Sequence, residues 1–444
     1  MAKIDQIVEN VKLTENGDLT FNSTLNKLID ILFMTEYYQK HLDKMPTLEV
    51  NDYNKLFAMF MRDPRYGMGK RDIGRMLLAN ENASIEDILK CGRVDDLFHI
   101  ATVEFYPMLD YLKSEIEKGN ELVKKWMPRY SSKNLMLARE IAAYWGMNKQ
   151  QYGKFIKCNT TVENKLSHHN ADSIVFEQVP SLAAIKYASR FARGEDTAKR
   201  YAAYLDDVRA GKKELKISTT TVYDIYKNRD KIDADLFFEK LEKIAISCVP
   251  VVDTSGSMMD NNDSFGKALA VGHYLAKCST YMPNKVVSFS SRPQVITLGN
   301  MGGRGVGTLY YDASSDSTYR KEIASMYTGD CSNTDLAKVM DLFAMADDVP
   351  EYIVILSDME FDCGSKHSKD ALMKIWKEKG YKTKIVWWNF NSRATTCPEM
   401  DSEGNIFMSG YNPMLLKFLS TNFDAQKFLD KLLNEYKAQI EKNK

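Results

Sequence analysis

The chain has 444 residues, a length that favours two or three domains, and its composition (44% hydrophobic, 27% charged) is typical of a globular protein. Its 60 basic and 60 acidic residues give a formal net charge of zero. This balance excludes a globally polybasic chain, so nucleic-acid binding would have to depend on local clusters of charge. The seven cysteines are scattered, odd in number and free of any CxxC pair, which argues against a zinc site and a disulfide framework.

The N-terminal segment, MAKIDQIVENVKLTENG, is charged and contains no apolar stretch of the kind that a signal peptide needs. No run of about 18 apolar residues occurs along the chain, so we expect no membrane span. A reducing cytoplasm is the default compartment for such a sequence. We therefore expect a cytoplasmic protein, and we expect it to be monomeric.

Residues 22–243 are predicted to form one helix after another. Apolar residues recur there with the spacing of one helix face, first at Leu25, Leu28, Ile29, Leu32 and Phe33. The same period recurs in YNKLFAMFMR, NLMLAREIAAYW and TAKRYAAYLDDV, with short loops between them. Helices in close succession are typical of α-solenoids, although no fixed repeat period is visible. We therefore predict an all-α helical-repeat domain over residues 1–243.

Two stretches of this half combine basic residues with turns or aromatic rings. The first is RDPRYGMGKRDIGR, and the second is residues 121–160, with eight basic residues, two acidic residues and interleaved Trp, Tyr and Phe. Single-stranded nucleic acid needs both phosphate neutralisation and stacking. The alternative is ordinary: solvated lysines and arginines on helix surfaces, with aromatic side chains in the core. The candidate RNA-contacting residues are Arg62, Arg65, Lys70, Arg71, Lys124, Lys125, Arg129, Lys133, Lys154 and Lys157.

The pattern changes near Lys243. The runs IAISCVPVV, KVVSFS, YIVILSD and KIVWWNF have the length and composition of buried strands, and helical stretches lie between them. Strands that alternate with helices indicate a mostly parallel sheet covered on both faces. We predict a doubly wound α/β domain over residues 244–444. Its last ~20 residues form an amphipathic helix that closes this domain or packs back on the helical half.

Small oxygen-bearing side chains are predicted to meet at one edge of this sheet. Asp253, Ser255 and Ser257 follow the first strand, Thr334 lies in a loop before a helix, and Asp358 follows another strand. In a doubly wound sheet, ligands bind outside the carboxyl ends of the strands. Carboxylates and hydroxyls are hard oxygen ligands that suit Mg²⁺ or Mn²⁺. The alternative is that Asp253 and the serines cap the next helix.

Catalytic motifs are not evident, so we expect a binding protein rather than an enzyme. The phosphatase pattern DxDx[TV] does not fit, because Ser255 occupies its second acidic position. No Ser-His or Cys-His pair is recognisable, and the adjacent His168 and His169 are interpreted as a solvated surface pair. A metal-dependent hydrolase would need a nucleophile or general base beside the metal.

The motifs DTSGSM, Thr334 in SNTDL and Asp358 in LSDME resemble the metal-ion-dependent adhesion site of von Willebrand factor A domains. The resemblance implies a Rossmann-like fold and a Mg²⁺ whose last ligand is a partner's carboxylate, water or a phosphate. Many family members have Asp-Gly at the last motif, whereas this chain has Asp358-Met359. The nearby Glu360 and Asp362 could therefore replace Asp358 as the acidic ligand.

A helical half followed by such a domain resembles the TROVE-module proteins, the Ro ribonucleoproteins, and more closely a family of this layout found in plants and phages. The resembling residues include ENGDLTFNSTLNKLIDILF, RDPRYGMGKRDIGR and VPSLAAIKYASRFARGEDTAKRYAAYLDDVRAGK. The resemblance implies HEAT-like repeats curved into a ring, closed by the second domain. It also implies a ribonucleoprotein or RNA chaperone that holds noncoding, misfolded or single-stranded RNA.

Ro-like RNA contacts do not transfer residue by residue, because no motif here aligns tightly with them. A second function therefore stays open. The protein would be a metal-dependent interaction scaffold, in which a carboxylate of a partner protein completes the metal site and the helical half is a docking surface.

Overall fold

The computed structural model describes most of the chain. The described residues are 11–13, 19–21, 26–131, 133–158, 162–167, 171–217, 220–260, 263–289, 292–300, 316–327, 335–359, 365–391, 399–400, 405–411, 413–418 and 424–442. Thr334, the pair His168 and His169, and the acidic residues Glu360 and Asp362 lie outside this part. The chain divides into two compact units, one of Met45–Thr219 with Asp430–Lys444 and one of Met1–Lys44 with Thr220–Leu429.

The first unit is helical throughout its described residues, as the sequence predicts. Short polar side chains begin several of its helices, since they accept hydrogen bonds from first-turn N–H groups. Ser84 and Asp87 form a capping box, and so do Asn148 and Gln151. The helices of its residues 45–219 are α4 (Asp52–Arg62), α5 (Arg71–Asn80), α6 (Ile85–Cys91), α7 (Val94–Leu97), α8 (Phe105–Glu117), α9 (Glu121–Trp126), α10 (Leu135–Tyr144), α11 (Lys149–Phe155), α12 (Val162–Ser167), η2 (Ala171–Ser173), η3 (Phe176–Gln178), α13 (Ser181–Phe191) and α14 (Glu195–Arg209). HEAT-like repeats and a closed ring remain predictions.

The C-terminal helix α23 (Ala425–Lys442) packs back on this helical unit through its later residues. The Tyr436 ring lies edge-on to Phe60, with their centroids 5.5 Å apart. The Tyr436 hydroxyl donates to Asp63 Oδ2 at 3.2 Å, in the interior. The later part of the helix therefore packs on the helical half, which is one of the two positions expected for the amphipathic end of the chain.

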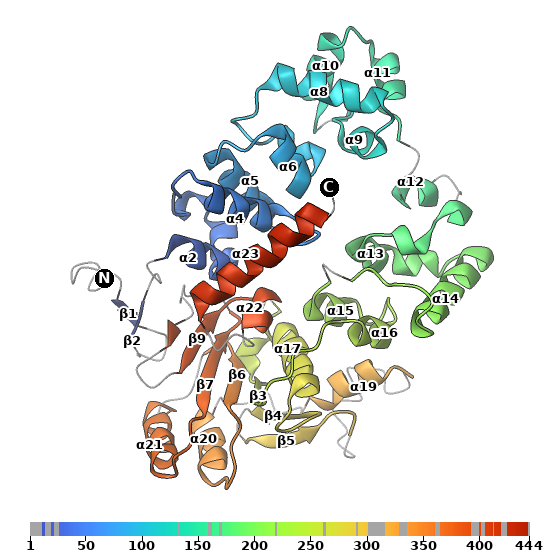
Figure 1. Ribbon diagram of the computed structural model, residues 1–444. Helices are drawn as coiled ribbons and strands as arrows, with labels where there is room; N and C mark the ends of the chain where they lie inside the picture. The colour runs from blue at the N-terminus through green and yellow to red at the C-terminus, as the bar shows by residue number, and fades with distance from the viewer. Residues whose placement is uncertain are drawn as a thin grey trace. The chain divides into compact units, whose positions relative to one another are not determined.

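The second unit is built on a seven-stranded sheet with the strand order β5-β4-β3-β6-β7-β9-β8 (Figure 1). Strands β4, β3, β6, β7 and β9 run parallel, and the two edge strands β5 and β8 run antiparallel to their neighbours. The sequence runs expected to be strands form β3, β4, β6 and β7. The strands are β3 (Cys248–Asp253), β4 (Lys285–Phe289), β5 (Gln294–Thr297), β6 (Tyr352–Ser357), β7 (Lys384–Asn389), β8 (Glu399–Met400) and β9 (Ile406–Ser409).

Helices cover both faces of this sheet, as a doubly wound fold requires. Alternate strand residues such as Val251, Ile355 and Trp387 form one core with α20 (Leu336–Ala344) and α21 (Ser365–Glu378). The intervening residues face α17 (Ser264–Cys278). A Cβ added at Gly272 of that helix would lie 2.6 Å from Val252 Cγ2. A glycine there lets α17 lie close against the strand.

The two compact units do not divide at residue 243, where the sequence analysis placed a domain boundary. Two further helices, α15 (Val222–Asn228) and α16 (Ala234–Glu239), belong to the sheet unit. Phe238 of α16 lies edge-on to His273 of α17, with their centroids 4.6 Å apart, and Asp235 accepts a 2.7 Å hydrogen bond from the Tyr319 backbone N–H. The apolar periodicity of a helix shows that one of its faces is buried, but it does not show which part of the protein packs on that face. The sequence pattern therefore cannot assign these two helices to one unit or the other.

Residues 1–44 also belong to the sheet unit. A short antiparallel pair, β1 (Val11–Leu13) and β2 (Leu19–Phe21), precedes α2 (Lys27–Phe33) and α3 (Thr35–Lys40). Phe33 packs on Phe418 of α22 (Pro413–Phe418) and on Phe428 at the start of α23. These contacts join the two ends of the chain within this unit. Across the described residues, no helix combines the length and apolar character needed to cross a bilayer.

Candidate functional site

The candidate metal site lies where the strand order of the sheet reverses. Strands β4 and β6 both pair in parallel with β3, one on each side, although β6 comes much later in the chain. Asp253 ends β3, and Ser357 ends the adjacent β6, so the register places the two residues opposite each other. Such a reversal point at the carboxyl ends of parallel strands is where doubly wound sheets bind ligands.

Three of the predicted metal ligands are close together. Asp253 is fully buried, and its Oδ1 accepts a 2.9 Å hydrogen bond from the Ser255 backbone N–H. The Ser255 and Ser257 hydroxyl oxygens lie 3.1 Å apart. Asp358 follows directly on β6, is also fully buried and influences Asp253 electrostatically. Thr334, the fifth predicted ligand, lies outside the described residues.

Ser357 was missed in the sequence, and it holds the central carboxylate in place. Its hydroxyl donates to Asp253 Oδ2 at 2.6 Å, across two adjacent strands. Its oxygen also accepts from the Met359 backbone N–H at 3.0 Å. The available signal was its position as the last residue of a predicted strand, directly before Asp358.

Met359 adopts a backbone conformation that glycine favours. Its φ is 64°, in the left-handed region that costs a non-glycine residue free energy. Its side chain is nevertheless buried in the core between the sheet, α20 and α21. The position after Asp358 thus keeps a glycine-like turn while it carries an apolar side chain, because the burial of that side chain offsets the backbone strain.

The electrostatics of this cluster are those of buried negative charge. Burial raises the pKa of Asp253 from 3.8 to about 6, and the neighbouring charge of Asp358 acts in the same direction, while hydrogen bonds from Ser357 and Ser255 oppose the rise. A cation at this place would remove the unfavourable burial of negative charge. The oxygen-only donor set fits a hard cation such as Mg²⁺. Among the described residues, no group of three or more His, Cys, Asp or Glu side chains could hold a metal, so the site would depend on its hydroxyls.

Arg62 does not belong among the RNA-contacting residues, and this prediction is corrected. Its side chain is only 2% exposed, and its guanidinium lies 2.6 Å from Asp96 Oδ2. Asp96 also accepts from Arg75 Nε at 2.7 Å and from the Arg93 backbone N–H at 2.7 Å. We expected Arg62 on a solvated helix face, because charged side chains usually lie on such faces. Here a buried carboxylate neutralises it instead.

The other basic residues of the first stretch are partly engaged. Arg65 is exposed but lies 3.4 Å from Asp63, and it also donates to the Lys90 carbonyl. Lys70 is half-buried at the start of α5, and Arg71 is exposed beside it. This stretch therefore offers fewer accessible charges than its sequence suggests.

The second stretch divides into a paired part and an accessible part. Lys124 and Lys125 of α9 form ion pairs with Glu121 at 2.8 Å and with Glu163 at 3.6 Å. Beyond α9, six basic residues are exposed, and none has an ion pair with a described carboxylate. We call these six the basic surface: Arg129, Lys133, Arg139, Lys149, Lys154 and Lys157.

The aromatic residues of this stretch serve two roles. Trp145 and Tyr152 are buried, so they belong to the core rather than to a stacking platform. Tyr130 is half-buried, with the Lys149 ammonium 5.7 Å from its ring centroid. Tyr144 is 41% exposed, but its ring centroid lies 4.9 Å from that of Tyr106 and its hydroxyl donates to Asp110. The alternative interpretation, in which the aromatic residues belong to the core, therefore holds for Trp145 and Tyr152.

Arg93, in the loop GRVDD, was not singled out in the sequence. Its guanidinium lies 4.6 Å from the centroid of the Trp126 ring, which the Lys125 ammonium also approaches at 5.3 Å. Burial and the neighbouring Arg62 charge hold the pKa of Arg93 below its usual value. The only sequence signal was a basic residue in a loop near a tryptophan-bearing segment.

Comparison with known proteins finds similarities to a family model, to a viral protein and to a solved structure. A family model described as a domain of unknown function, DUF7788, matches residues 247–444. The chain is 23% identical over 512 residues to Uncharacterized protein L728 of Acanthamoeba polyphaga mimivirus. The aligned region covers 96% of this chain and 88% of that protein. Among solved structures, the Deinococcus radiodurans RO (RSR) protein matches with a TM-score of 0.40 and 12% identity, covering 96% of this chain and 95% of that chain. None of these descriptions states a ligand or an activity.

Proposed function

We propose that this protein binds single-stranded RNA through the basic surface and carries a Mg²⁺ ion at the carboxyl edge of its sheet, as a Ro-like RNA chaperone or ribonucleoprotein component. The observation that carries the proposal is the set of six exposed cations between Arg129 and Lys157 that lack carboxylate partners among the described residues. Exposed cations without such partners favour a polyanion, and the half-buried Tyr130 ring beside Lys149 offers one place for a base to stack.

The expected strength of the electrostatic contribution follows from the number of charges. Each phosphate of a single strand that is neutralised contributes about 0.7 to the slope of log K against log salt. If all six cations of the basic surface meet phosphates, the slope would be about −4. Ion pairs such as Lys124 with Glu121 would contribute less, because an internal carboxylate already neutralises them.

The metal site would be of the von Willebrand A type. Asp253, Ser255, Ser257, Thr334 and Asp358 would hold the ion, with Ser357 positioning Asp253 through its 2.6 Å hydrogen bond. A Mg²⁺ ion held partly by neutral hydroxyls would remain able to accept an acidic ligand. We propose a binding role for this site and no catalytic one.

Fluorescence anisotropy with a labelled single-stranded RNA, titrated at two salt concentrations beside a DNA of the same sequence, tests the RNA proposal. We expect binding that weakens steeply with salt, by roughly a hundredfold or more from 50 to 200 mM, and that favours RNA. Absence of binding at low salt would overturn the proposal. A partner protein that EDTA releases from a nucleic-acid-free sample would then favour the interaction scaffold.

A further inference from the structure

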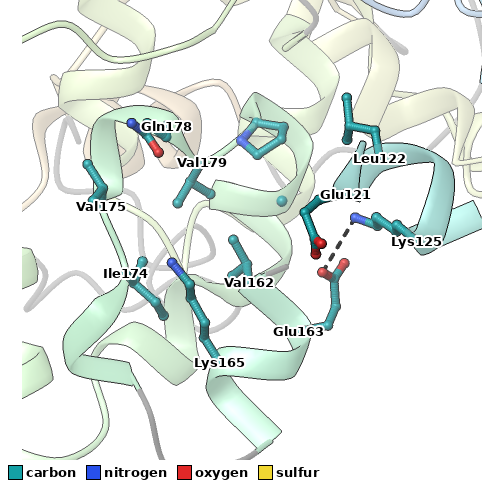
Figure 2. A pocket seen from close by; sticks show the side chains of 12 residues that line it. Glu121, Leu122, Lys125, Val162, Glu163, Lys165, Ile174, Val175, Gln178 and Val179 are labelled. Carbon is teal, nitrogen blue, oxygen red and sulfur yellow. Dashed lines mark ion pairs between the residues drawn. The ribbon is translucent and has the colours of Figure 1, made fainter. Parts of the chain in front are cut away.

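A pocket of about 210 Å³ lies in the helical unit, between α9, α12 and the segment that leads into α13 (Figure 2). Its apolar lining includes Val162, Ile174 and Val179, of which Ile174 and Val179 are buried. Pockets for drug-sized ligands usually have volumes of about 300–1,000 Å³. This pocket therefore suits a single ring system rather than a whole nucleotide or a folded peptide.

Charged side chains gather on one side of the pocket. Figure 2 shows the Glu121 and Glu163 carboxylates beside the Lys125 ammonium, with the dashed line joining Lys125 to Glu163 at 3.6 Å. The Tyr187 hydroxyl donates to Glu163 Oε1 at 3.3 Å. A carboxylate has about four acceptor positions. Glu121 also forms an ion pair with Lys124 at 2.8 Å, so both glutamates line the pocket as carboxylates that already have a cationic partner.

The opposite wall is held in place by basic side chains that bind backbone. Lys165 Nζ donates to the Ser173 carbonyl at 2.8 Å, and Arg200 Nη2 donates to the Ile174 carbonyl at 2.7 Å. These bonds fix the short segment before α13, so the apolar wall is present before any ligand arrives. A preformed wall avoids part of the ordering cost of binding.

The pocket also lies next in the chain to the proposed RNA surface. Leu122 and Lys125 of α9 line it, and Arg129, the first residue of the basic surface, follows three residues after that helix. An RNA strand whose phosphate contacts Arg129 would therefore pass within reach of α9, which lines the pocket. Sequence-selective RNA recognition generally uses unstacked bases that are packed on side chains and hydrogen-bonded along their edges.

We propose that this pocket accepts one unstacked base of the bound RNA and favours adenine or cytosine over uracil. The inference rests on the proposed function. The apolar wall would pack against the ring, and Glu121 and Glu163 would accept hydrogen bonds from an exocyclic amino group. Carboxylates read the cytosine amino group in this way in other nucleic-acid sites. Uracil presents a carbonyl oxygen at the equivalent position, which cannot donate a hydrogen bond to either carboxylate.

The test uses the full-length protein and two uridine oligomers of about ten nucleotides, one of which has a single adenosine near its centre. Anisotropy should show roughly ten-fold tighter binding of the adenosine-containing oligomer, as expected for one good edge contact. Ala183→Trp places an indole in the pocket and should abolish this preference. Ala203→Trp, on the exposed side of α14, is the matched control and should keep it.

A conservative variant guards against misfolding of the filled pocket. Glu163→Gln retains the size of a partly exposed side chain but removes its charge, and it should reduce the adenosine preference by several-fold. If wild type shows no preference, or if Ala183→Trp and Glu163→Gln both keep it, the pocket proposal is overturned while RNA binding stands. If neither oligomer binds to wild type, the proposed function falls together with it.

Discussion

Replacing Asp253 with asparagine should stabilise the metal-free protein at neutral pH. Burial raises the pKa of this carboxyl from 3.8 to about 6 in the folded protein. As pH rises, the Asp253 carboxyl therefore ionises in the unfolded chain before it does so in the folded protein. The free energy of unfolding falls between about pH 4 and pH 6 as a result. A difference of about two pKa units corresponds to about 3 kcal/mol. Asp253→Asn removes this penalty, so its free energy of unfolding at pH 7 in EDTA should exceed that of wild type by up to about 3 kcal/mol.

Urea denaturation at several pH values, with and without Mg²⁺, measures this effect. Below about pH 3 the two proteins should have similar stability, since the wild-type carboxyl is then protonated in both states. Added Mg²⁺ should stabilise wild type, because it binds only the folded state, and should leave Asp253→Asn unchanged. Ser288→Ala, on the neighbouring strand β4, is a control for a buried polar change outside the proposed ligand set. A variant less stable than wild type at pH 7 in EDTA would refute the reasoning, since it would make the carboxylate a structural group.

Three further changes test other parts of the molecule. Lys154→Gln combined with Lys157→Gln should make the slope of log K against log salt for RNA shallower by about 1.4, whereas Lys199→Gln, outside the basic surface, should leave it unchanged. Asp96→Ala should lower the free energy of unfolding by about 3–5 kcal/mol, measured by urea denaturation, because it leaves a buried guanidinium unpaired; a loss below about 1 kcal/mol would contradict that account. Met359→Gly should relieve about 1 kcal/mol of backbone strain but lose more from the core, for a net destabilisation of about 1–3 kcal/mol. A more stable glycine variant would show that the strain outweighs the packing.

Strand composition predicted the central part of the sheet, but its edges needed the structure. The buried strands β3, β6 and β7 are nearly continuous apolar runs. Such runs are typical of a parallel sheet that is covered on both faces, because side chains on both sides of each strand are then buried. The edge strands β5 and β8 have only four and two residues, and β9 beside β8 has four; short runs of that kind do not differ from loops in sequence. Their strand character comes from pairing with a neighbour, which no local pattern records.

Charge was the least reliable guide to the surface. Arg62 and Arg129 are both basic residues in basic stretches, yet one is sealed against Asp96 and the other is exposed. Their difference depends on which carboxylate the fold brings near. The residues that line the pocket, from α9, α12 and α13, show the same limitation, because they come from three separate segments.

The sequence by itself determined that a helical region precedes an α/β sheet, and that Asp253, Ser255 and Ser257 lie at the end of a buried strand. It could do so because helix and strand periods, and the turn after a strand, are encoded within a few neighbouring residues. Only the tertiary structure decided that α15 and α16 belong with the sheet, that Ser357 supports Asp253, and which cations remain accessible. These outcomes depend on contacts between residues far apart in the chain, where burial and pairing are set by the whole packed unit.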